Sequence, residues 1–280
     1  MDEPLWSRLH GVRVVADPVW RNRLAAAGID GFPDLDRFVP FSVGRENRSV
    51  VHVPEPGNGP GFFLKRYRYR GWRILRTFLY RAKASREAEN LRRLEALGIP
   101  AVRPAAWGAR RRFGFLADSF LVTESRPGAT NARALVTDYL TGRPAPVPRD
   151  TFRAVLNRVV DDLATLHAQG IFLFTAFEKN LLVWRTDTAA EYAWVDLPFG
   201  GRFPPGRLPV WLRVRDLACL NKGLDAVLTR ADRLRLLRRY AGPGTGRAER
   251  RDLAARVLRA TRVLRDQTPV SRLVRALKGR

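Results

Sequence analysis

The 280-residue sequence contains a single cysteine, Cys219, and three histidines. One cysteine excludes an internal disulfide and a cysteine-based zinc site, and it is typical of a protein from a reducing compartment. The sequence has no uncharged apolar run of transmembrane length, and residues 1–6 lack the basic and apolar regions that open a secretory signal. We therefore expect a cytoplasmic protein.

Acidic residues are scarce beside basic ones, with 27 against 51, and the formal net charge is +24. One explanation is a G+C-rich coding bias, because only five of the basic residues are lysines. The other is an anionic partner, either nucleic acid, a membrane surface or a phosphorylated glycolipid. The apolar content of 45% is that of a globular protein, and the length allows one domain or two lobes.

Two short apolar runs, 181–184 and 192–195, flank a polar turn and predict a β-hairpin. Asn180 comes directly before the first predicted strand, and Asp196 comes directly after the second. An amide oxygen and a carboxylate would then meet at the same edge of a small sheet. Hard oxygen ligands of this kind suit Mg²⁺ that also carries substrate phosphates. Before the hairpin, residues 151–167 form a strongly periodic helical pattern.

A second candidate constellation lies earlier in the chain. Runs 38–43, 49–53 and 61–65 predict strands, and the last of them ends in the rare lysine Lys65. Glu87 is the next acidic residue and falls inside a predicted helix over 81–97. Glu87 precedes three leucines at helical spacing and can face inward with them, next to Lys65. The alternative is an ordinary carboxylate on the helix surface.

Between these two residues, the segment 66–86 carries eight basic residues, no acid and several interleaved aromatics. This composition suits a membrane interface or an anionic glycolipid, and would also suit single-stranded nucleic acid. A solvated face with core aromatics is the alternative. The tail over 247–280 is helical in pattern, with eleven basic residues against three acids, and it predicts solvated or membrane-facing helices.

These motifs together resemble the bacterial lipopolysaccharide core kinase family, which comprises heptose and Kdo kinases. The resemblance covers about residues 38–240 and rests on Phe63-Leu-Lys65, the Glu87 run to Gly98-Ile-Pro, the Leu-His-x-x-Gly-Ile turn, Asn180, Val195-Asp196 and Arg215-Asp216-Leu217. It implies an α+β, two-lobed, protein-kinase-like fold with a mainly β N-lobe carrying one long helix and a larger, mainly α C-lobe. The expected divisions are a leader over 1–36, an N-lobe over 37–125 and a C-lobe over 126–280.

The resemblance also implies a cofactor, a substrate and roles for individual residues. The family transfers the γ-phosphate of ATP, with Mg²⁺, to a sugar hydroxyl of a membrane-embedded glycolipid. We thus expect peripheral association with the inner face of the cytoplasmic membrane. By position, the implied roles are phosphate binding by Lys65, orientation of Lys65 by Glu87, adenine binding by backbone groups of Glu124, Ser125 and Arg126, metal binding by Asn180 and Asp196, and bracing of the catalytic loop by Asp216.

One position departs from the kinase pattern. The catalytic aspartate, expected five residues before Asn180, is replaced by Thr175, and the nearest acidic residue is Glu178. A general base contributes on the order of 10²–10⁴-fold to the rate of an enzyme. Because this base is missing at Thr175, three functions stay open. They are a lipopolysaccharide core kinase with Glu178 as a substitute base, a nucleotide-binding pseudokinase that acts as a scaffold or regulator, and a basic nucleic-acid-binding protein, against which both constellations argue. The acceptor sugar and the oligomeric state stay undetermined.

Overall fold

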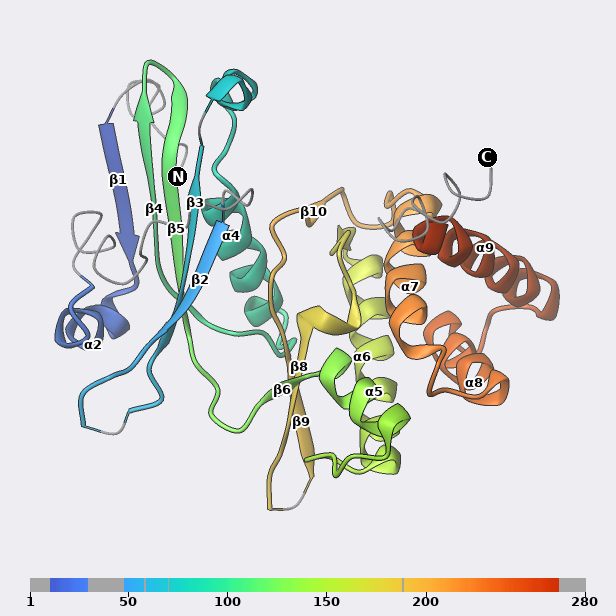
Figure 1. The fold of residues 1–280 in the computed structure, drawn as a ribbon. Coiled ribbons are helices and arrows are strands. Elements are labelled where there is room, and N and C mark those ends of the chain that lie inside the picture. Colours follow the sequence, from blue (N-terminus) through green and yellow to red (C-terminus); the bar gives the residue numbers. More distant parts are fainter. Residues whose placement is uncertain (1–10, 30–47, 58, 70, 188, 267–280) are drawn as a thin grey trace, which may run out of the picture. The chain divides into compact units, whose positions relative to one another are not determined.

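The structure is a computed structural model that describes residues 11–29, 48–57, 59–69, 71–187 and 189–266. The chain divides into two compact units, residues 1–127 and 128–280 (Figure 1). The first unit is built on a β-sheet and the second mainly on helices. This is the two-lobed α+β fold that we expected.

The first unit contains an antiparallel five-stranded sheet with the strand order β1-β4-β5-β3-β2 (Figure 1). The expected strand 38–43 lies outside the described residues. The predicted strand at Lys65 does not end there, because the ladder with its neighbour continues to residue 68. The strands are β1 (Gly11–Ala16), β2 (Arg48–Val53), β3 (Phe62–Arg68), β4 (Pro104–Arg112) and β5 (Phe115–Glu124).

The two faces of this sheet bury different side chains. On β3, Phe62 and Leu64 point to a core that also contains Trp20 and Leu24, from η1 (Pro18–Trp20) and α2 (Arg21–Ala26). Because successive strand residues alternate between faces, Lys65 points to the opposite face, which contacts α4 (Lys83–Ala96). The segment η2 (Gly71–Thr77) connects β3 to α4.

The sequence sets residues 1–36 apart as a leader, and the structure corrects this for the described part of the segment. β1 pairs with β4 over its whole length, and Trp20 and Leu24 fill the core beneath the sheet. Residues 11–29 are therefore part of the sheet layer. The local pattern of this segment is short and ambiguous, and only its pairing with residues about 90 positions away reveals its place.

The second unit is centred on α6, which buries the apolar positions that the helical period predicts. A three-stranded sheet with the strand order β6-β8-β9 lies beside it, and β10 pairs with β7. The elements are β6 (Thr130–Asn131), α5 (Ala132–Thr141), α6 (Arg149–Ala168), β7 (Ile171–Phe172), η3 (Glu178–Asn180), β8 (Leu181–Arg185), β9 (Ala190–Trp194), β10 (Gly201–Arg202), α7 (Val210–Leu224), α8 (Arg230–Ala241) and α9 (Arg247–Asp266).

The tail is helical over α9, as predicted, and residues 267–280 lie outside the described residues. One face of α9 packs on α7, where Lys222 donates to the Leu264 carbonyl and Asn221 donates to the Thr261 hydroxyl. This face is therefore neither solvated nor available to a membrane. No helix in the described part of the chain is long and apolar enough to cross a membrane.

Candidate functional site

A buried ion pair lies on the α4 side of the first unit's sheet. The Nζ atom of Lys65 is 2.8 Å from Oε1 and 2.9 Å from Oε2 of Glu87. Both side chains are buried, with 7% and 2% of the two residues exposed. A buried charge is tolerated when it is paired and hydrogen-bonded. The structure therefore brings together the lysine and the carboxylate that the sequence selected.

A third residue completes this arrangement. The Tyr67 hydroxyl donates to Oε2 of Glu87 at 3.1 Å. Tyr67 is two residues after Lys65, so both side chains leave β3 on the same face. Sequence reasoning missed Tyr67, although its spacing from Lys65 gives the signal. Together Tyr67 and Glu87 fix the position of the ammonium group on the α4 side of the sheet.

The expected adenine-binding segment follows the end of β5. Two of its backbone donors already have partners within the first unit: the N–H of Glu124 donates to the Arg103 carbonyl, and the N–H of Ser125 donates to the Gly61 carbonyl. Arg126 forms an ion pair with Glu124 at 3.3 Å. An adenine ring bound here would have to use other backbone groups of this segment. The expected role of this segment in adenine binding is therefore limited to the backbone groups that have no partner named above.

In the second unit, the β8–β9 hairpin brings Thr175, Asn180 and Asp196 together. Asn180 precedes β8, and its carbonyl accepts from the N–H of Val195, just after β9. The Asn180 side-chain amide donates to the carbonyls of Thr175 at 2.9 Å and Asp196 at 3.3 Å. The Thr175 hydroxyl also donates to the Asp196 carbonyl at 3.3 Å. The hairpin therefore brings the Asn180 side chain next to the Asp196 backbone.

This donor set suits a hard cation. With its N–H₂ group engaged by two carbonyls, Asn180 retains an amide oxygen as its potential ligand. Asp196 has a φ of 57°, in the left-handed region that aspartate tolerates better than bulky residues. An amide oxygen and a carboxylate are ligands that Mg²⁺ accepts, while phosphates and water supply the rest. Asn180 and Asp196 therefore fit the implied metal.

Asp216 braces the loop before this cluster. It is fully buried in α7, and its Oδ2 accepts from the Leu173 N–H at 2.7 Å. This bond joins Asp216 directly to the loop that the resemblance assigns it to brace. Nε2 of His167 lies 3.3 Å from the same oxygen, and its Nδ1 lies 2.7 Å from the Tyr240 hydroxyl. Burial raises the pKa of Tyr240 well above its ordinary value.

Further contacts from α7 hold the same loop. Phe174, with a φ of 63°, has its carbonyl bonded by Nε of Arg215 at 3.2 Å and by the Cys219 thiol at 3.8 Å. The Arg215 guanidinium lies over the Phe174 ring, 3.8 Å from its centroid. Sequence reasoning missed the roles of Arg215 and Cys219, because no local pattern links them to a loop about 40 residues away. The loop that contains Thr175 is thus fixed from one side by a single helix.

Glu178, the suggested substitute base, is turned toward other partners. Its Oε1 accepts from Nε of Arg133 at 2.7 Å, and only 4% of the residue is exposed. A Cβ atom placed on Gly223 would lie 2.0 Å from the Glu178 carboxyl group. The carboxylate therefore faces a glycine of α7 and an arginine of α5. This geometry indicates a structural residue and argues against a base for an acceptor beside Thr175.

Comparisons with known proteins agree with these observations. The model of the lipopolysaccharide kinase (Kdo/WaaP) family matches residues 59–240. The chain is 28% identical over 192 residues to the lipopolysaccharide core heptose(I) kinase WaaP of Pseudomonas aeruginosa, across 65% of this chain and 70% of that protein. A solved structure of WaaP in complex with acyl carrier protein matches with a TM-score of 0.65 at 24% identity, over 89% of this chain and 97% of the other. The structural likeness shows a kinase-like fold.

Proposed function

Because this chain belongs to the lipopolysaccharide kinase (Kdo/WaaP) family, we propose that it transfers the γ-phosphate of ATP to a sugar hydroxyl of the lipopolysaccharide core. The buried ion pair between Lys65 and Glu87 carries this proposal. A buried ammonium group held by two carboxylate oxygens, one of which also accepts from a tyrosine, has little structural advantage over apolar residues of similar size. It is, however, the arrangement that a phosphate-binding lysine needs.

The residues have distinct parts in this reaction. Lys65 binds the α- and β-phosphates, and Glu87 with Tyr67 keeps its ammonium group in position. Asn180 and Asp196 hold Mg²⁺, which neutralises the charge on the transferred phosphate. Phosphoryl transfer passes through a loose transition state, so positioning and charge stabilisation supply most of the rate enhancement. Asp216 keeps the loop of Thr175 in place for the acceptor.

A second function has its own support. Thr175 presents a hydroxyl that donates to the Asp196 carbonyl, and the Glu178 carboxylate faces Arg133 and α7. Neither group is placed to accept a proton from an acceptor at neutral pH. A nucleotide-binding pseudokinase with a scaffolding or regulatory role is therefore the alternative. Both functions include nucleotide binding, and in both we expect the protein at the inner face of the cytoplasmic membrane.

The first test is nucleotide binding, measured as the shift in melting temperature at millimolar Mg²⁺-ATP. Binding to the folded state alone raises the melting temperature by mass action, with about 2.7 kcal/mol of stabilisation at a hundredfold excess over Kd. We expect a shift for the wild type that falls when Mg²⁺ is removed. In Asp196→Asn the Mg²⁺-dependent part should disappear, because a carboxylate ligand is replaced by a neutral amide.

The matched control is Asp187→Asn, at the exposed far end of the same hairpin. It makes the same chemical change and should keep the full Mg²⁺-dependent shift. Absence of any shift in the wild type would contradict both functions and leave a kinase-like fold without a nucleotide. Transfer of labelled γ-phosphate to purified lipopolysaccharide core then separates the kinase from the pseudokinase.

A further inference from the structure

One end of the first unit's sheet displays a group of large apolar side chains. They come from η2, the residues that follow it and the turn between β4 and β5, which lie at the same end of the sheet in Figure 1. We call this group the tip surface, and its exposed members are Trp72 (64%), Leu75 (65%), Phe78 (52%), Leu79 (44%), Tyr80 (49%) and Phe113 (68%). Scattered exposed apolar residues are ordinary, whereas a contiguous group marks an interaction site.

The turn that displays Phe113 has a strained backbone. Phe113 and Gly114 connect β4 to β5, with φ values of 51° and 79°. Two positive φ angles are those of a type I′ turn, in which asparagine or glycine is the favoured first residue. A bulky aromatic there is strained, and this one is also exposed to water. Such strain persists where a function retains it.

The distribution of strained residues supports the same conclusion. Among the described residues, four other than glycine have a positive φ: Leu79, Phe113, Phe174 and Asp196. Two of them lie in the candidate nucleotide site of the second unit. The other two lie on the tip surface of the first unit. Within the part of the chain that the structure describes, positive φ at residues other than glycine is therefore confined to the region of Phe174 and Asp196 and to this surface.

The tip surface is held firmly from beneath. The Leu79 N–H donates to the Gly114 carbonyl at 3.0 Å, and the Phe78 and Phe115 rings lie 5.1 Å apart. Buried Arg111 donates to the carbonyls of Tyr80 and Gly114 at 2.6 and 3.1 Å. These contacts join the residues that follow η2 to the β4–β5 turn. The apolar side chains are therefore displayed by a fixed platform.

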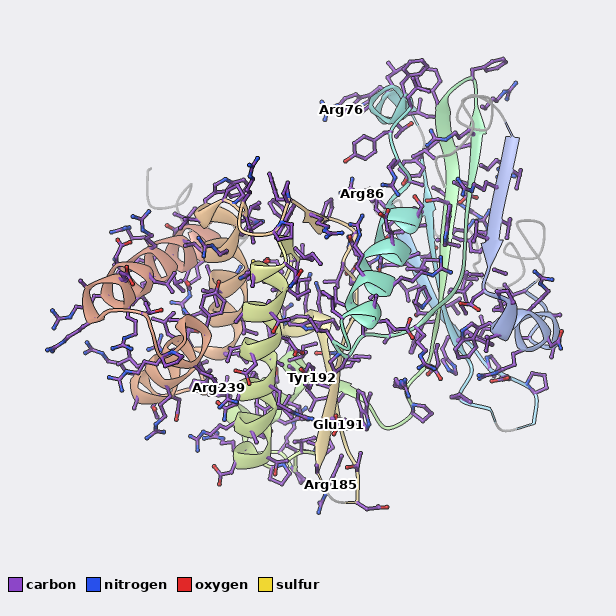
Figure 2. All side chains as sticks on the ribbon, turned by 180° about the vertical axis from the view of Figure 1, so that it is seen from behind. Arg76, Arg86, Arg185, Glu191, Tyr192 and Arg239 are labelled. Carbon is purple, nitrogen blue, oxygen red and sulfur yellow. The ribbon has the colours of Figure 1, made fainter. Side chains whose placement is uncertain are left out.

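Basic groups surround these apolar side chains. The Arg76 guanidinium lies over the Trp72 ring at 4.6 Å, Arg86 lies over Tyr80 at 5.4 Å, and Arg112 lies over Phe113 at 5.7 Å. Figure 2 shows Arg76 and Arg86 at this end of the unit. The Glu89 carboxylate on α4 is paired with Arg81 and Arg93. Residues 66–86 themselves contain no acid.

Not all of the basic segment belongs to this surface. Arg66 is buried, and its guanidinium pairs with Asp118 on β5 at 2.5 Å. The prediction that the segment 66–86 faces a membrane is therefore wrong for Arg66, because this residue is part of β3 and its side chain pairs with a buried carboxylate of β5. The part that remains exposed begins at η2.

From these observations we propose that the tip surface docks on an anionic lipid bilayer. Tryptophan, tyrosine and phenylalanine side chains enter the interfacial region, where amphipathic aromatic rings are favoured, and the arginines stay level with the lipid phosphates. Each basic residue near an anionic bilayer adds attraction that salt screens within a Debye length. This docking deepens the proposed function, since it would keep the enzyme at the surface that carries its glycolipid acceptor.

The test is sedimentation of the full chain with vesicles, in the absence of nucleotide, so that its result is independent of any kinase activity. Vesicles of phosphatidylcholine with phosphatidylglycerol should retain the protein at low salt, and vesicles of phosphatidylcholine alone should not. We expect Trp72→Ala to lower the partition coefficient roughly tenfold, through lost apolar burial. Arg76→Glu changes two charge units and should lower it by tenfold or more.

Two matched controls lie in the second unit. Trp211 is similarly exposed (61%), and Arg251 is an exposed arginine of α9, the tail helix that the sequence also suggested for membrane contact. Trp211→Ala and Arg251→Glu should leave vesicle binding within twofold of the wild type. If Arg251→Glu and Arg76→Glu weaken binding equally, the attraction belongs to net charge and the tip surface proposal fails.

A fluorescent dye attached to the tip surface would show directly whether lipid, protein or nucleic acid covers it. Cys219 is buried, and burial raises the pKa of its thiol to about 12, so an environment-sensitive thiol dye should label only a cysteine placed by Leu75→Cys. The emission of this dye should shift to the blue when anionic vesicles are added. Emission that is already blue-shifted without vesicles would show that protein covers this surface and would overturn the proposal. A larger shift with an oligonucleotide than with vesicles would overturn it in favour of nucleic acid.

Discussion

Lys65 is one of many basic residues, and its buried surroundings distinguish it from most of the others. The chain has 51 basic residues, but Lys65 is nine-tenths buried and pairs with a carboxylate that is itself buried. Burying such a pair has a large free-energy cost of desolvation, and removing either partner leaves the other as an uncompensated buried charge. Exposed pairs such as Arg81–Glu89 gain little, because water and salt screen them.

We predict that Lys65→Met lowers the free energy of unfolding by about 3–5 kcal/mol, because the buried Glu87 carboxylate loses its counter-ion. The double variant Lys65→Met/Glu87→Gln should recover much of this loss while remaining unable to bind Mg²⁺-ATP. Urea unfolding measures the first effect, and the thermal shift measures the second.

Lys83→Met is the control for this pair, since Lys83 is a half-buried lysine at the start of α4. It should change stability little and retain nucleotide binding. A double variant that is no more stable than Lys65→Met, or that still binds Mg²⁺-ATP, would contradict the role given to Lys65.

Thr175 and Glu178 decide whether the family's chemistry is retained. We predict that Thr175→Asp raises phosphate transfer to lipopolysaccharide core by about 10²–10⁴-fold, because it restores a carboxylate as general base. Glu178→Gln should leave the wild-type rate unchanged and cost about 1–3 kcal/mol of stability, because it breaks the buried contact with Arg133. Release of ADP and urea unfolding measure the two effects.

The outcome of these two substitutions separates the candidate functions. A wild type that turns over well, but loses turnover in Glu178→Gln without losing stability, would show that Glu178 does act as the base. If neither the wild type nor Thr175→Asp transfers phosphate, while Mg²⁺-ATP still binds, the pseudokinase is the correct function.

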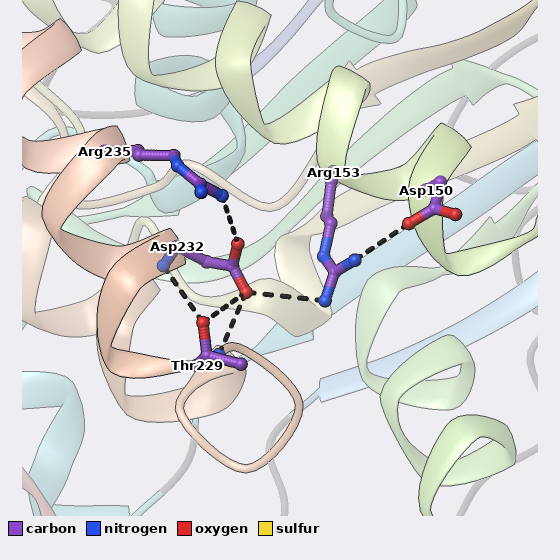
Figure 3. Close-up of polar contacts among 5 residues, drawn as sticks. All are labelled: Asp150, Arg153, Thr229, Asp232 and Arg235. Carbon is purple, nitrogen blue, oxygen red and sulfur yellow. Dashed lines mark hydrogen bonds and ion pairs between the residues drawn. The ribbon is translucent and has the colours of Figure 1, made fainter.

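At the scale of the element, the start of α8 shows how a helix end is joined to the rest of its unit. Thr229 and Asp232 form a capping box, in which the Thr229 hydroxyl accepts from the Asp232 N–H and Oδ2 of Asp232 accepts from the Thr229 N–H (Figure 3). Arg153 of α6 reaches the same carboxylate at 3.4 Å. The cap therefore also connects α8 to the central helix.

We predict that Thr229→Ala lowers the free energy of unfolding at pH 7 by about 1 kcal/mol, the usual cost of losing an N-cap. The hydrogen bond from Thr229 lowers the pKa of Asp232, so this carboxylate adds stability above its unfolded-state pKa of about 4. That stability is lost as the pH falls through the lower pKa of the folded state. The difference between wild type and Thr229→Ala should therefore shrink below pH 4.

Denaturant unfolding measures this stability difference. The measurements run from roughly pH 3 to pH 7, a range that spans the titration of Asp232. Thr141→Ala serves as the control, because the Thr141 hydroxyl donates to the backbone carbonyls of Thr137 and Asp138 within α5. Its small cost should not vary with pH. A pH-independent difference for Thr229→Ala would contradict the contribution of Asp232.

At the scale of the whole molecule, the net charge of +24 has no single cause. Many arginines are engaged by acids within their own unit, such as Arg239 with Asp161 and Arg158 with Glu191. The spread of arginine over both units is what a coding bias produces. The tip surface differs because its arginines lie over exposed aromatic rings, in a stretch of chain without acids. Local arrangement, and not total charge, therefore indicates an anionic partner.

The sequence by itself determined the features that depend on short-range periodicity. The buried positions of α6, the β8–β9 hairpin and the inward direction of Glu87 all follow from repeats of 3.6 or two residues. The hairpin also determined that Asn180 and Asp196 meet, because antiparallel pairing brings the start of one strand beside the end of the next.

Tertiary structure decided the contacts between residues that are distant in the chain. Only the packed fold joins β1 to β4, directs Glu178 to Gly223 and Arg133, and makes Asp216 bind the Leu173 N–H. It also separates buried Arg66 from the exposed tip surface within a single basic segment. A local pattern records which faces an element buries, but it does not record what covers them, because the covering partner is chosen by the packing of the whole unit.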